Sequence, residues 1–492
     1  MHALTSLDSM FLATEDGRAV ANVCSLAIMD GVDTGGKRLT RSDIQELIAE
    51  RLHLLPPLRW RLVDVPLGLG HPWWVDCGSD IDLDFHVRET AVVSPGDRNA
   101  LETLVARLSA HPMDRSKPLW EMYVIHGLHD DRIALLTKLH HAAVDGLSGG
   151  EVLNVIFDTT EEGRGPGPAP GRPRERQPGQ FGMLARAIAD LPRRQLHTTS
   201  AARRTLTNLD QVATLRSVPG LGTIGRAVRR VSAPRDDRAA ALETSTPKAP
   251  RLRFNGRITP HRRVTLTSMA LADVKAIKTH FDATVNDVVV ALCAGALRRW
   301  LAARDELPHR ALVAAIPVSV RAQAELGTYG NRVGTMLAAL PTDEADPAVR
   351  LRRCRAELRA AKQRHEAVPT SLMRDANDLI PPVLFGRAVR AMTGVAASDS
   401  LTPVANLVIS NVPGPRSPLY CAGRRIREHY PVSTISDSLG LNVTVFSYVD
   451  RLEIGLVGDR DSVWDLPGLA DAFDAELQLL LQTTVEPRRS HA

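Results

Sequence analysis

A stretch rich in proline and glycine, GRGPGPAPGRPRERQPGQ at Gly163–Gln180, constrains the fold more than any other feature of this sequence. Its proline, glycine and charged residues leave no apolar stripe that could pack on a core, so we expect a linker here. The chain has 492 residues, and at roughly 100–200 residues per domain this corresponds to two or three domains. We therefore expect two folded halves, at 1–160 and 251–492, joined by the segment 161–250.

Both halves alternate between helical and strand patterns, which predicts a mixed α/β fold. Thr40 or Ser42 can cap a helix that reaches Leu55, and Thr284 and Asp287 have the spacing of a capping box. The other expected helices are Arg98–Ser109, one after Gly149-Gly150, Thr284–Arg304 and Leu466–Leu481, and the expected strands are Asp131–Leu139, Arg262–Leu271, Ala311–Val318, Asn406–Ser410, Asn442–Tyr448 and Arg451–Val457.

Composition excludes several classes of protein. Hydrophobic residues make up 44% of the chain and charged residues 24%, close to the globular average, so the chain is not intrinsically disordered. The five cysteines are dispersed without a CxxC pair, which disfavours a structural zinc site and a disulfide framework. This cysteine usage favours a reducing, cytoplasmic location.

The formal net charge of +5 is concentrated in the joint between the halves. Residues 161–250 hold 16 Lys and Arg against 8 Asp and Glu, a local +8, which leaves 45 against 48, or −3, elsewhere. Such a segment can attract the phosphates of nucleic acid, of anionic lipid or of a nucleotide-bearing cofactor. No nucleic-acid-binding motif or interleaved aromatic residues accompany the basic ones, so we do not expect nucleic acid as a partner.

The sequence predicts peripheral membrane contact at most. The N-terminus has neither a basic region nor an apolar core of a secretory signal. The apolar run Val288–Leu297 is shorter than the ~18–20 residues that a membrane-spanning helix needs. Phe181, Leu184, Ile188 and Leu191 recur at helical spacing beside arginines, which fits a helix lying on a membrane and equally a helix packed between the halves.

Residues 138–146, KLHHAAVDG, carry the chemistry of the chain. His140 and His141 stand at the end of an apolar strand, before the turn-forming pair Asp145-Gly146. Consecutive strand residues point to opposite faces, so one histidine is expected to be catalytic and the other structural. A neutral imidazole can accept a proton from a hydroxyl and return it to a leaving group. A structural or metal-ligand pair is the alternative, but a metal site lacks further ligands at a recognisable spacing.

The pattern HHxxxDG resembles the signature of CoA-dependent acyltransferases. Other segments resemble the bacterial wax ester synthase/acyl-CoA:diacylglycerol acyltransferase (WS/DGAT) family, and together they cover nearly the whole chain apart from 161–250. These segments are LDSMFLATED, SKPLWEM at Ser116–Met122, TVNDVVVALCAGALRRWL at Thr284–Leu301, PVSVR, GNRVG and SNVPGP. The resemblance implies two chloramphenicol-acetyltransferase-like domains, each a sheet with helices, and an active-site tunnel between them.

The resemblance also implies roles for the motif residues. The second histidine, His141, corresponds to the general base that deprotonates the acceptor hydroxyl for direct attack on the thioester, with His140 beside it. Asp145 and Gly146 complete the motif, and Asp145 is expected to fix the loop, with Arg321 as a candidate partner. No metal is implied.

Four further positions are implied as substrate-binding or tunnel residues. Asn286, in the ND pair of the second-half helix, is expected to orient groups across the tunnel, unless it only satisfies its own helix backbone. Glu15 is expected to line the site, unless it is an ordinary solvated side chain, and Ser410 and Asn411 belong to the tunnel wall or to a strand-ending turn. Trp120 is expected to be structural, packed behind the motif strand with its N–H satisfied.

The resemblance implies an O-acyltransferase that uses long-chain acyl-CoA as co-substrate and needs no cofactor. The expected reaction makes triacylglycerol from diacylglycerol, with wax esters from fatty alcohols as a second activity. One alternative is an acyltransferase of the same fold for another alcohol or an amine, and another is a lipid-binding or lipid-droplet protein without turnover. The expected location is cytoplasmic, peripheral to the inner membrane or to lipid droplets.

Overall fold

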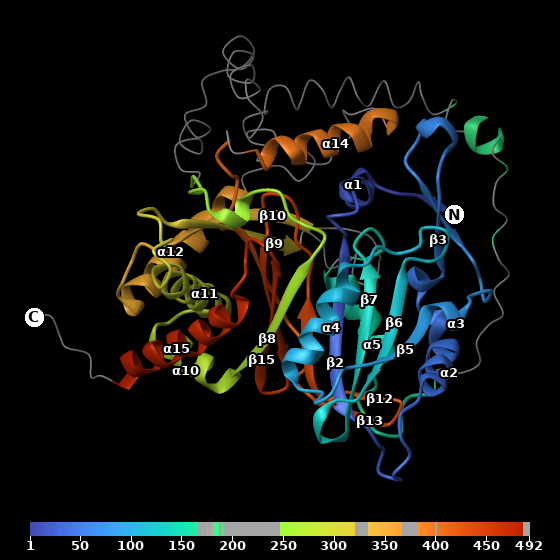
Figure 1. Ribbon diagram of the computed structural model, residues 1–492, viewed down its shortest axis with the longest axis horizontal. Coiled ribbons are helices and arrows are strands. Elements are labelled where there is room, and N and C mark those ends of the chain that lie inside the picture. Colours follow the sequence, from blue (N-terminus) through green and yellow to red (C-terminus); the bar gives the residue numbers. More distant parts are fainter. Residues whose placement is uncertain are drawn as a thin grey trace, which may run out of the picture.

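The computed structural model describes residues 1–144, 146–165, 175, 179, 181–185, 189, 247–319, 333–366, 382–398 and 401–485. Most of the expected joint, Asp145 and Arg321 lie outside these residues. The described chain forms two six-stranded sheets and one three-stranded sheet, with helices packed around them (Figure 1). The expected mixed α/β fold is therefore confirmed.

The first large sheet carries the strand order β12-β13-β2-β7-β6-β5. Neighbouring strands are antiparallel, except that β5 is parallel to β6. The strands are β2 (Asn22–Asp30), β5 (Val87–Ala91), β6 (Trp120–His126), β7 (Arg132–His140), β12 (Tyr420–Cys421) and β13 (Arg424–Val432). The helices from this part of the chain are α2 (Arg41–Arg51), α3 (Leu83–His86), α4 (Arg98–Ala110) and α5 (Gly146–Ile156).

The two faces of this sheet belong to different cores, as the alternation of side chains along each strand requires. On one face, Met29 and Leu135 pack with Ile48 of α2 and Ile156 of α5. On the other face, residues such as Leu136 pack with α4 and with strands of the second sheet. The motif strand β7 is thus buried on both sides.

Strands β12 and β13 come from the C-terminal part of the chain, within the range 251–492. Strand β13 pairs along β2, with Tyr430 opposite Leu26, although the two strands are some 400 residues apart in sequence. The first sheet is therefore not built from the N-terminal half alone, because residues 420–432, which follow the joint in sequence, supply two of its strands.

The second large sheet has the order β10-β9-β11-β14-β15-β8. Helix α11 packs against this sheet, and its residues Val288, Leu292 and Leu297 are fully buried in the core. The strands are β8 (Arg262–Ala270), β9 (Leu312–Ser319), β10 (Val333–Leu340), β11 (Leu407–Val412), β14 (Leu441–Tyr448) and β15 (Arg451–Asp459). The helices are α10 (Leu271–His280), α11 (Val285–Ala302), α12 (Pro347–Glu366) and α15 (Leu466–Val485).

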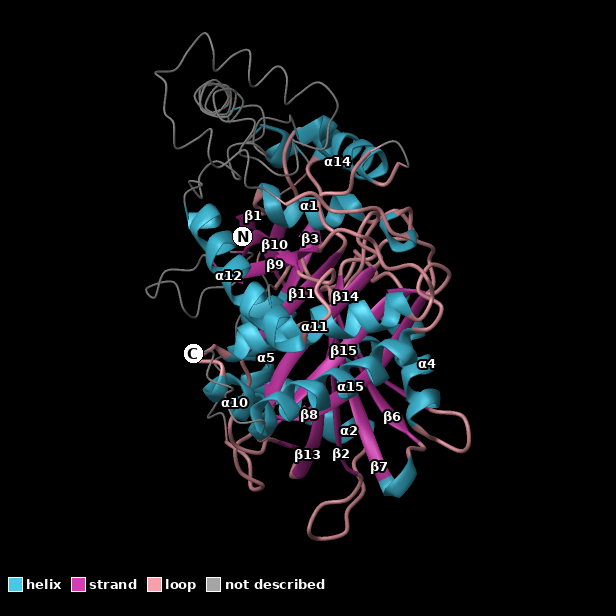
Figure 2. Cartoon of the chain, turned by 90° about the vertical axis from the view of Figure 1, so that its left-hand side faces the viewer, coloured by secondary structure: helices cyan, strands magenta, loops and turns pink. Residues whose placement is uncertain are grey.

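The two large sheets meet through α4 and through the contact of β13 with β15, and Figure 2 shows strands of both running through the middle of the molecule. The backbone N–H of Leu266 in β8 donates to Glu102 Oε1 of α4 at 2.8 Å. Gly455 of β15 faces the carbonyl of Pro431 so closely that a Cβ would collide with it. The halves are therefore closely packed at this place.

Two helices lie over the end of the sheets at which β7 finishes. Helix α14 (Pro382–Ala396) spans the top of the molecule in Figure 1, next to α1 (Ser6–Thr14). The two helices pack through Met10 and Ala13 of α1 and Phe385 and Val389 of α14. The three-stranded sheet nearby has the order β1-β4-β3 and consists of β1 (His2–Ala3), β3 (Trp60–Val63) and β4 (Trp73–Asp76).

Among the described helices, no single one has both the length and the apolar composition to span a membrane. The pair formed by α10 and α11 meets that test only when the two are taken together, and it is bent by 101°.

Local signals in the sequence predicted several of these elements. Thr40 caps α2 in a capping box with Asp43, and Thr284 caps α11 in a box with Asp287, which confirms both predicted starts. The predicted helix after Gly149-Gly150 was placed too late, because α5 already begins at Gly146. Glycine disfavours a helix because it has more conformational freedom in the unfolded chain than other residues. In α5 the packing of the helix on the protein outweighs this cost.

Candidate active site

His140 is the last residue of β7 and is buried, with 1% of its surface exposed. Its Nδ1 accepts a hydrogen bond from the backbone N–H of Ala142 at 3.0 Å, and its Nε2 lies 3.1 Å from Glu15 Oε1. Because Nδ1 is the acceptor, Nε2 carries the hydrogen and donates to the carboxylate. His140 therefore ties the motif loop to the N-terminal segment.

Glu15 follows α1 and joins three groups. Besides His140, its carboxylate accepts from the backbone N–H of Ala21 at 2.9 Å and from Arg115 Nη2 at 2.8 Å. Burial would raise the pKa of Glu15, but the hydrogen bond from His140, with those from Arg115 and the backbone of Ala21, lowers it to about 2. The carboxylate is thus ionised and well held, and not a solvated side chain.

His141 is the first residue beyond the strand, and its side chain lies in a different place from that of His140. The backbone N–H of His141 donates to the carbonyl of Ala21 at 2.8 Å. Its half-buried imidazole stacks on the ring of Phe11, with the ring centroids 4.0 Å apart and the planes 11° from parallel. The strand ends at His140, so His141 is the first residue of the turn. The two side chains therefore have different surroundings, as expected.

Helix α1 and the residue directly after it thus contact both histidines. Phe11 lies in α1 and Glu15 directly follows it, so the two residues have the i, i+4 spacing that places side chains on one face of a helix. Sequence reasoning selected Glu15 but missed Phe11. The signal that could have found it is the helical spacing within LDSMFLATED.

The remaining motif residues lie in or beside the core. Ala142, Ala143 and Val144 are almost fully buried, which explains why this turn is built from small apolar residues. Gly146 begins α5, and Asp145 lies outside the described residues. Trp120 of β6 is buried and its Nε1 donates to the Leu58 carbonyl at 2.8 Å, which confirms its structural role.

A second group of predicted residues gathers on the second sheet. Asn411 of β11 donates through Nδ2 to Oδ1 of Asn286, in the first turn of α11, at 3.3 Å. Ser410 precedes Asn411 within β11 and is opposite Thr444 of β14, so neither residue lies in a turn as one reading of SNVPGP had it. The amide of Asn286 therefore contacts another element as well as belonging to its own helix.

Hydrogen bonds connect the histidine loop to the second sheet. Ala21 accepts from the backbone of His141, and the carbonyl of the preceding residue, Val20, accepts from the hydroxyl of Thr434. The carbonyl of Thr434 in turn accepts from Asn442 Nδ2 at 3.0 Å, and Asn442 is paired with Val408 in β11. The end of β7 therefore lies beside the sheet that contains Asn411, whose side chain bonds to Asn286 of α11.

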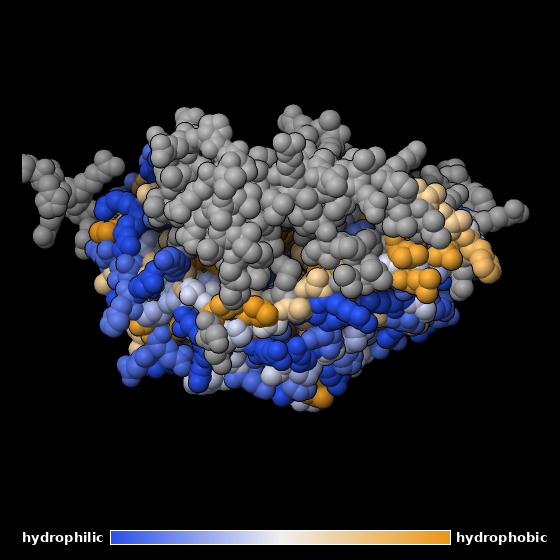
Figure 3. Space-filling model, turned by 90° about the horizontal axis from the view of Figure 1, so that it is seen from above, coloured by the Kyte–Doolittle hydropathy of each residue, from blue (hydrophilic) through white to orange (hydrophobic). Residues whose placement is uncertain are grey.

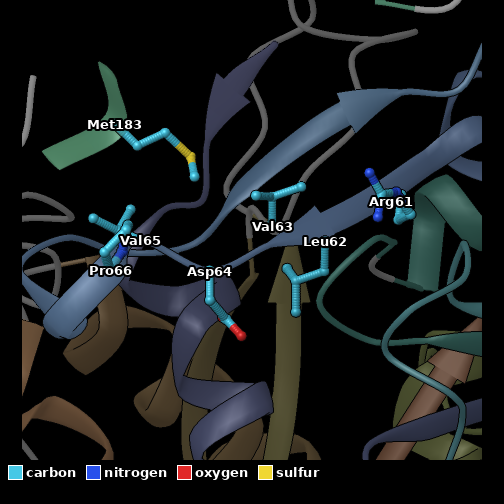
Figure 4. Close-up of a pocket in the computed structure, with 7 residues that line it drawn as sticks. All are labelled: Arg61, Leu62, Val63, Asp64, Val65, Pro66 and Met183. Carbon is cyan, nitrogen blue, oxygen red and sulfur yellow. The ribbon is translucent and has the colours of Figure 1, made fainter. Parts of the chain in front are cut away.

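A separate pocket of about 410 Å³ lies beside the small sheet. Figure 4 shows Val63 and Val65 on one side of it and Met183, from the helical turn 181–185, on the other. None of the predicted site residues lines this pocket. Of the apolar stripe predicted for the joint helix, Phe181 is 89% exposed and Leu184 is half-buried, whereas Ile188 and Leu191 lie outside the described residues.

Comparison with known proteins identifies the chain. Residues 4–289 match the wax ester synthase/diacylglycerol acyltransferase catalytic domain, and residues 329–481 match the WS/DGAT C-terminal domain. The chain belongs to the WS/DGAT family. A Mycobacterium tuberculosis relative named "Probable diacyglycerol O-acyltransferase tgs2" is 33% identical, over 96% of this chain and 98% of its own length.

Solved structures agree with the fold of this WS/DGAT chain. The wax ester synthase/diacylglycerol acyltransferase from Marinobacter aquaeolei VT8 is 29% identical with a TM-score of 0.68, covering 98% of this chain and 99% of that one. The first condensation domain of the CDA synthetase is 14% identical with a TM-score of 0.58, covering 99% and 96% of the two chains. The second likeness concerns the fold alone.

Proposed function

We propose that this WS/DGAT chain transfers an acyl group from long-chain acyl-CoA to the hydroxyl of diacylglycerol, and also to fatty alcohols. The observation that carries this proposal is the geometry of His141, a half-buried imidazole at a strand end, held by Ala21 and Phe11 in a chain that matches the catalytic domain. The names of the relatives in Mycobacterium support diacylglycerol as the acceptor.

In the proposed reaction His141 accepts the proton of the acceptor hydroxyl while that oxygen bonds to the thioester carbonyl carbon. The transfer must be concerted, because a free aliphatic alcohol is too weak an acid to ionise near neutral pH. The tetrahedral intermediate then collapses, the C–S bond breaks, and the CoA sulfur takes the proton back from the imidazolium. A thiol pKa of about 8.5 makes thiolate a good leaving group, so the histidine assists this step only modestly.

The groups around His141 have supporting roles in this proposal. His140 holds the loop through Glu15 and Ala142, and because it is buried and already bonded at both nitrogens it is not the base. We propose that Asp145 and Gly146 shape the turn that leads into α5. No cofactor takes part, and acyl-CoA is a substrate.

We propose that Asn286, Asn411 and Ser410 form the opposite wall of a substrate tunnel. Asn286 Oδ1 accepts from Asn411. The Nδ2 group of Asn286 can therefore donate a hydrogen bond to a ligand carbonyl. Such a donor would stabilise the oxyanion of the tetrahedral intermediate.

The acceptor is tested by product analysis. Purified protein is incubated with palmitoyl-CoA and, in separate reactions, with diolein, hexadecanol or a polar alcohol, and thiol release and ester formation are followed together. Triacylglycerol from diolein, with wax ester from hexadecanol, is the expected result. Ester formed only from the polar alcohol would favour the alternative acceptor, and binding of acyl-CoA without thiol release would favour a lipid-binding protein.

We also propose a peripheral contact with a membrane or lipid-droplet surface. Phe181 and Leu67 are 89% and 76% exposed, and Pro66 and Met183, close to them in sequence, line the same pocket. Apolar surface gathers at the right-hand end of Figure 3, and the joint that follows Phe181 is basic, as an anionic lipid surface requires.

This contact is tested by flotation with vesicles of phosphatidylcholine alone or mixed with phosphatidylglycerol. The double change Phe181→Ser and Leu67→Ser is expected to reduce flotation with the mixed vesicles, whereas Val93→Ser, at a residue 75% exposed elsewhere, is expected to leave it unchanged. Equal flotation of both variants would contradict the proposal.

A further inference from the structure

The ring of Phe11 covers one face of the His141 imidazole. The centroids are 4.0 Å apart and the planes are 11° from parallel, so the two rings are stacked. Phe11 is itself partly buried and packs against the core of the first sheet. An aromatic face carries negative potential, and it attracts a cation placed over it.

Helix α1 presents Phe11 from a fixed position. Thr5 caps the helix and exchanges hydrogen bonds with Asp8 in a capping box. Behind the helix, Met10 and Ala13 pack on α14. Arg115 Nη2 donates to the carbonyl of Leu12 at 2.8 Å, so the last turn is also held. A ring on such a helix can restrain the imidazole that it covers.

We propose that Phe11 is a positioning residue for His141, which holds the imidazole plane and stabilises its protonated form. This inference rests on the proposed role of His141 as the general base. The imidazole becomes a cation only when it takes the proton of the acceptor, so its contact with the ring of Phe11 strengthens as the transition state is reached. Binding that strengthens in the transition state accelerates the chemical step more than it affects substrate binding.

The charged residues that directly follow α1 have partners of their own. Glu15 is paired with Arg115 and bonded to His140, and Arg18 lies with Asp16 and Asp437. Asp145 is in the motif but outside the described residues. A change at Phe11 alters none of these side chains, so its effect on His141 can be separated from theirs.

The test compares apolar replacements with and without an aromatic face. Phe11→Leu and Phe11→Met keep an apolar cover but lose the ring, whereas Phe11→Tyr keeps the ring. Met10→Leu is the matched control, because Met10 lies on the same helix but packs against α14. The pKa of His141 is read by NMR of histidine labelled with ¹³C at Cε1, with the signal assigned from its loss in His141→Gln.

Phe11→Leu and Phe11→Met are expected to lower the pKa of His141 by about half a unit, which is the size of a modest cation–π interaction. They are also expected to lower kcat roughly two- to five-fold, with little change in KM for palmitoyl-CoA. Phe11→Tyr and Met10→Leu are expected to match the wild type in both measurements.

An unchanged pKa in both ring-free variants would overturn the inference, and so would an equal shift in Met10→Leu. Thermal unfolding of each variant identifies any that fail to fold, and the inference can then be judged on the other ring-free variant. If the wild type makes no ester from any acceptor, the proposed function fails, whereas the NMR titration still decides whether Phe11 stabilises protonated His141.

Discussion

Replacing Glu15 by glutamine keeps the shape of the side chain but removes its negative charge. The oxygen of glutamine, placed where Oε1 lies, can still accept from both His140 and Ala21, but an NH₂ group in place of Oε2 cannot accept from Arg115. The pKa of Glu15 is lowered from 4.5 to about 2, so at about 1.4 kcal/mol per unit the ionised form contributes about 3 kcal/mol to stability. The side chain is only 10% exposed, so solvent screens this contribution little.

The sign of this contribution sets its pH dependence. A carboxyl whose pKa is depressed on folding stabilises the protein fully above its unfolded pKa of 4.5, and the stabilisation is lost as the pH falls towards 2. Glu15→Gln is therefore expected to lower the free energy of unfolding by up to about 3 kcal/mol at pH 7.5. The difference from wild type should narrow steadily below pH 4.5.

Urea unfolding at a series of pH values measures this difference. The matched control is Glu89→Gln, because Glu89 also pairs with a histidine, His126, at 2.5 Å but is 49% exposed. Glu89→Gln is expected to lower the free energy of unfolding by less than about 1 kcal/mol. Equal losses in the two variants, or a loss in Glu15→Gln that does not change with pH, would refute the reasoning.

Two further predictions concern the contact between the sheets. Burial and the neighbouring Glu428 raise the pKa of Glu453 to about 7, so this carboxyl costs stability as the pH rises from 4.5 through 7. Glu453→Gln is expected to raise the thermal midpoint at pH 8 and to leave it nearly unchanged at pH 4. Gly455→Ala places a methyl group against the Pro431 carbonyl and is expected to lower the midpoint by several degrees, whereas Gly165→Ala, in open space, should not. Differential scanning calorimetry measures all three changes, and equal midpoints for the two alanine variants would contradict the close contact.

Local sequence signals predicted several of the elements around the site, although not α1. Capping residues marked where helices begin, as at Thr40 and Thr284, and alternating apolar residues marked β7. These signals depend on neighbours within a few residues, so a single sequence contains them. The histidine pair was found because it stands in a motif at the end of such a strand.

Long-range pairing could not be predicted in the same way. The sequence of β13 contains no local pattern that predicts its pairing with β2, near the other end of the chain. The partner and the register of a strand are set only when the sheet assembles. The stacking of Phe11 on His141 and the bond from His140 to Glu15 depend likewise on where α1 comes to lie over β7. Both are products of tertiary packing.

The rate of ester formation by His141→Ala tests the central claim most directly. His129→Ala is the control, since His129 is exposed in the turn before β7, at the other end of the same strand. With palmitoyl-CoA and diolein, loss of the base is expected to slow triacylglycerol formation about 10²- to 10⁴-fold, while the control keeps the wild-type rate. A folded His141→Ala variant that retains more than about a tenth of the wild-type rate would contradict the account, because general-base catalysis contributes at least about a hundredfold.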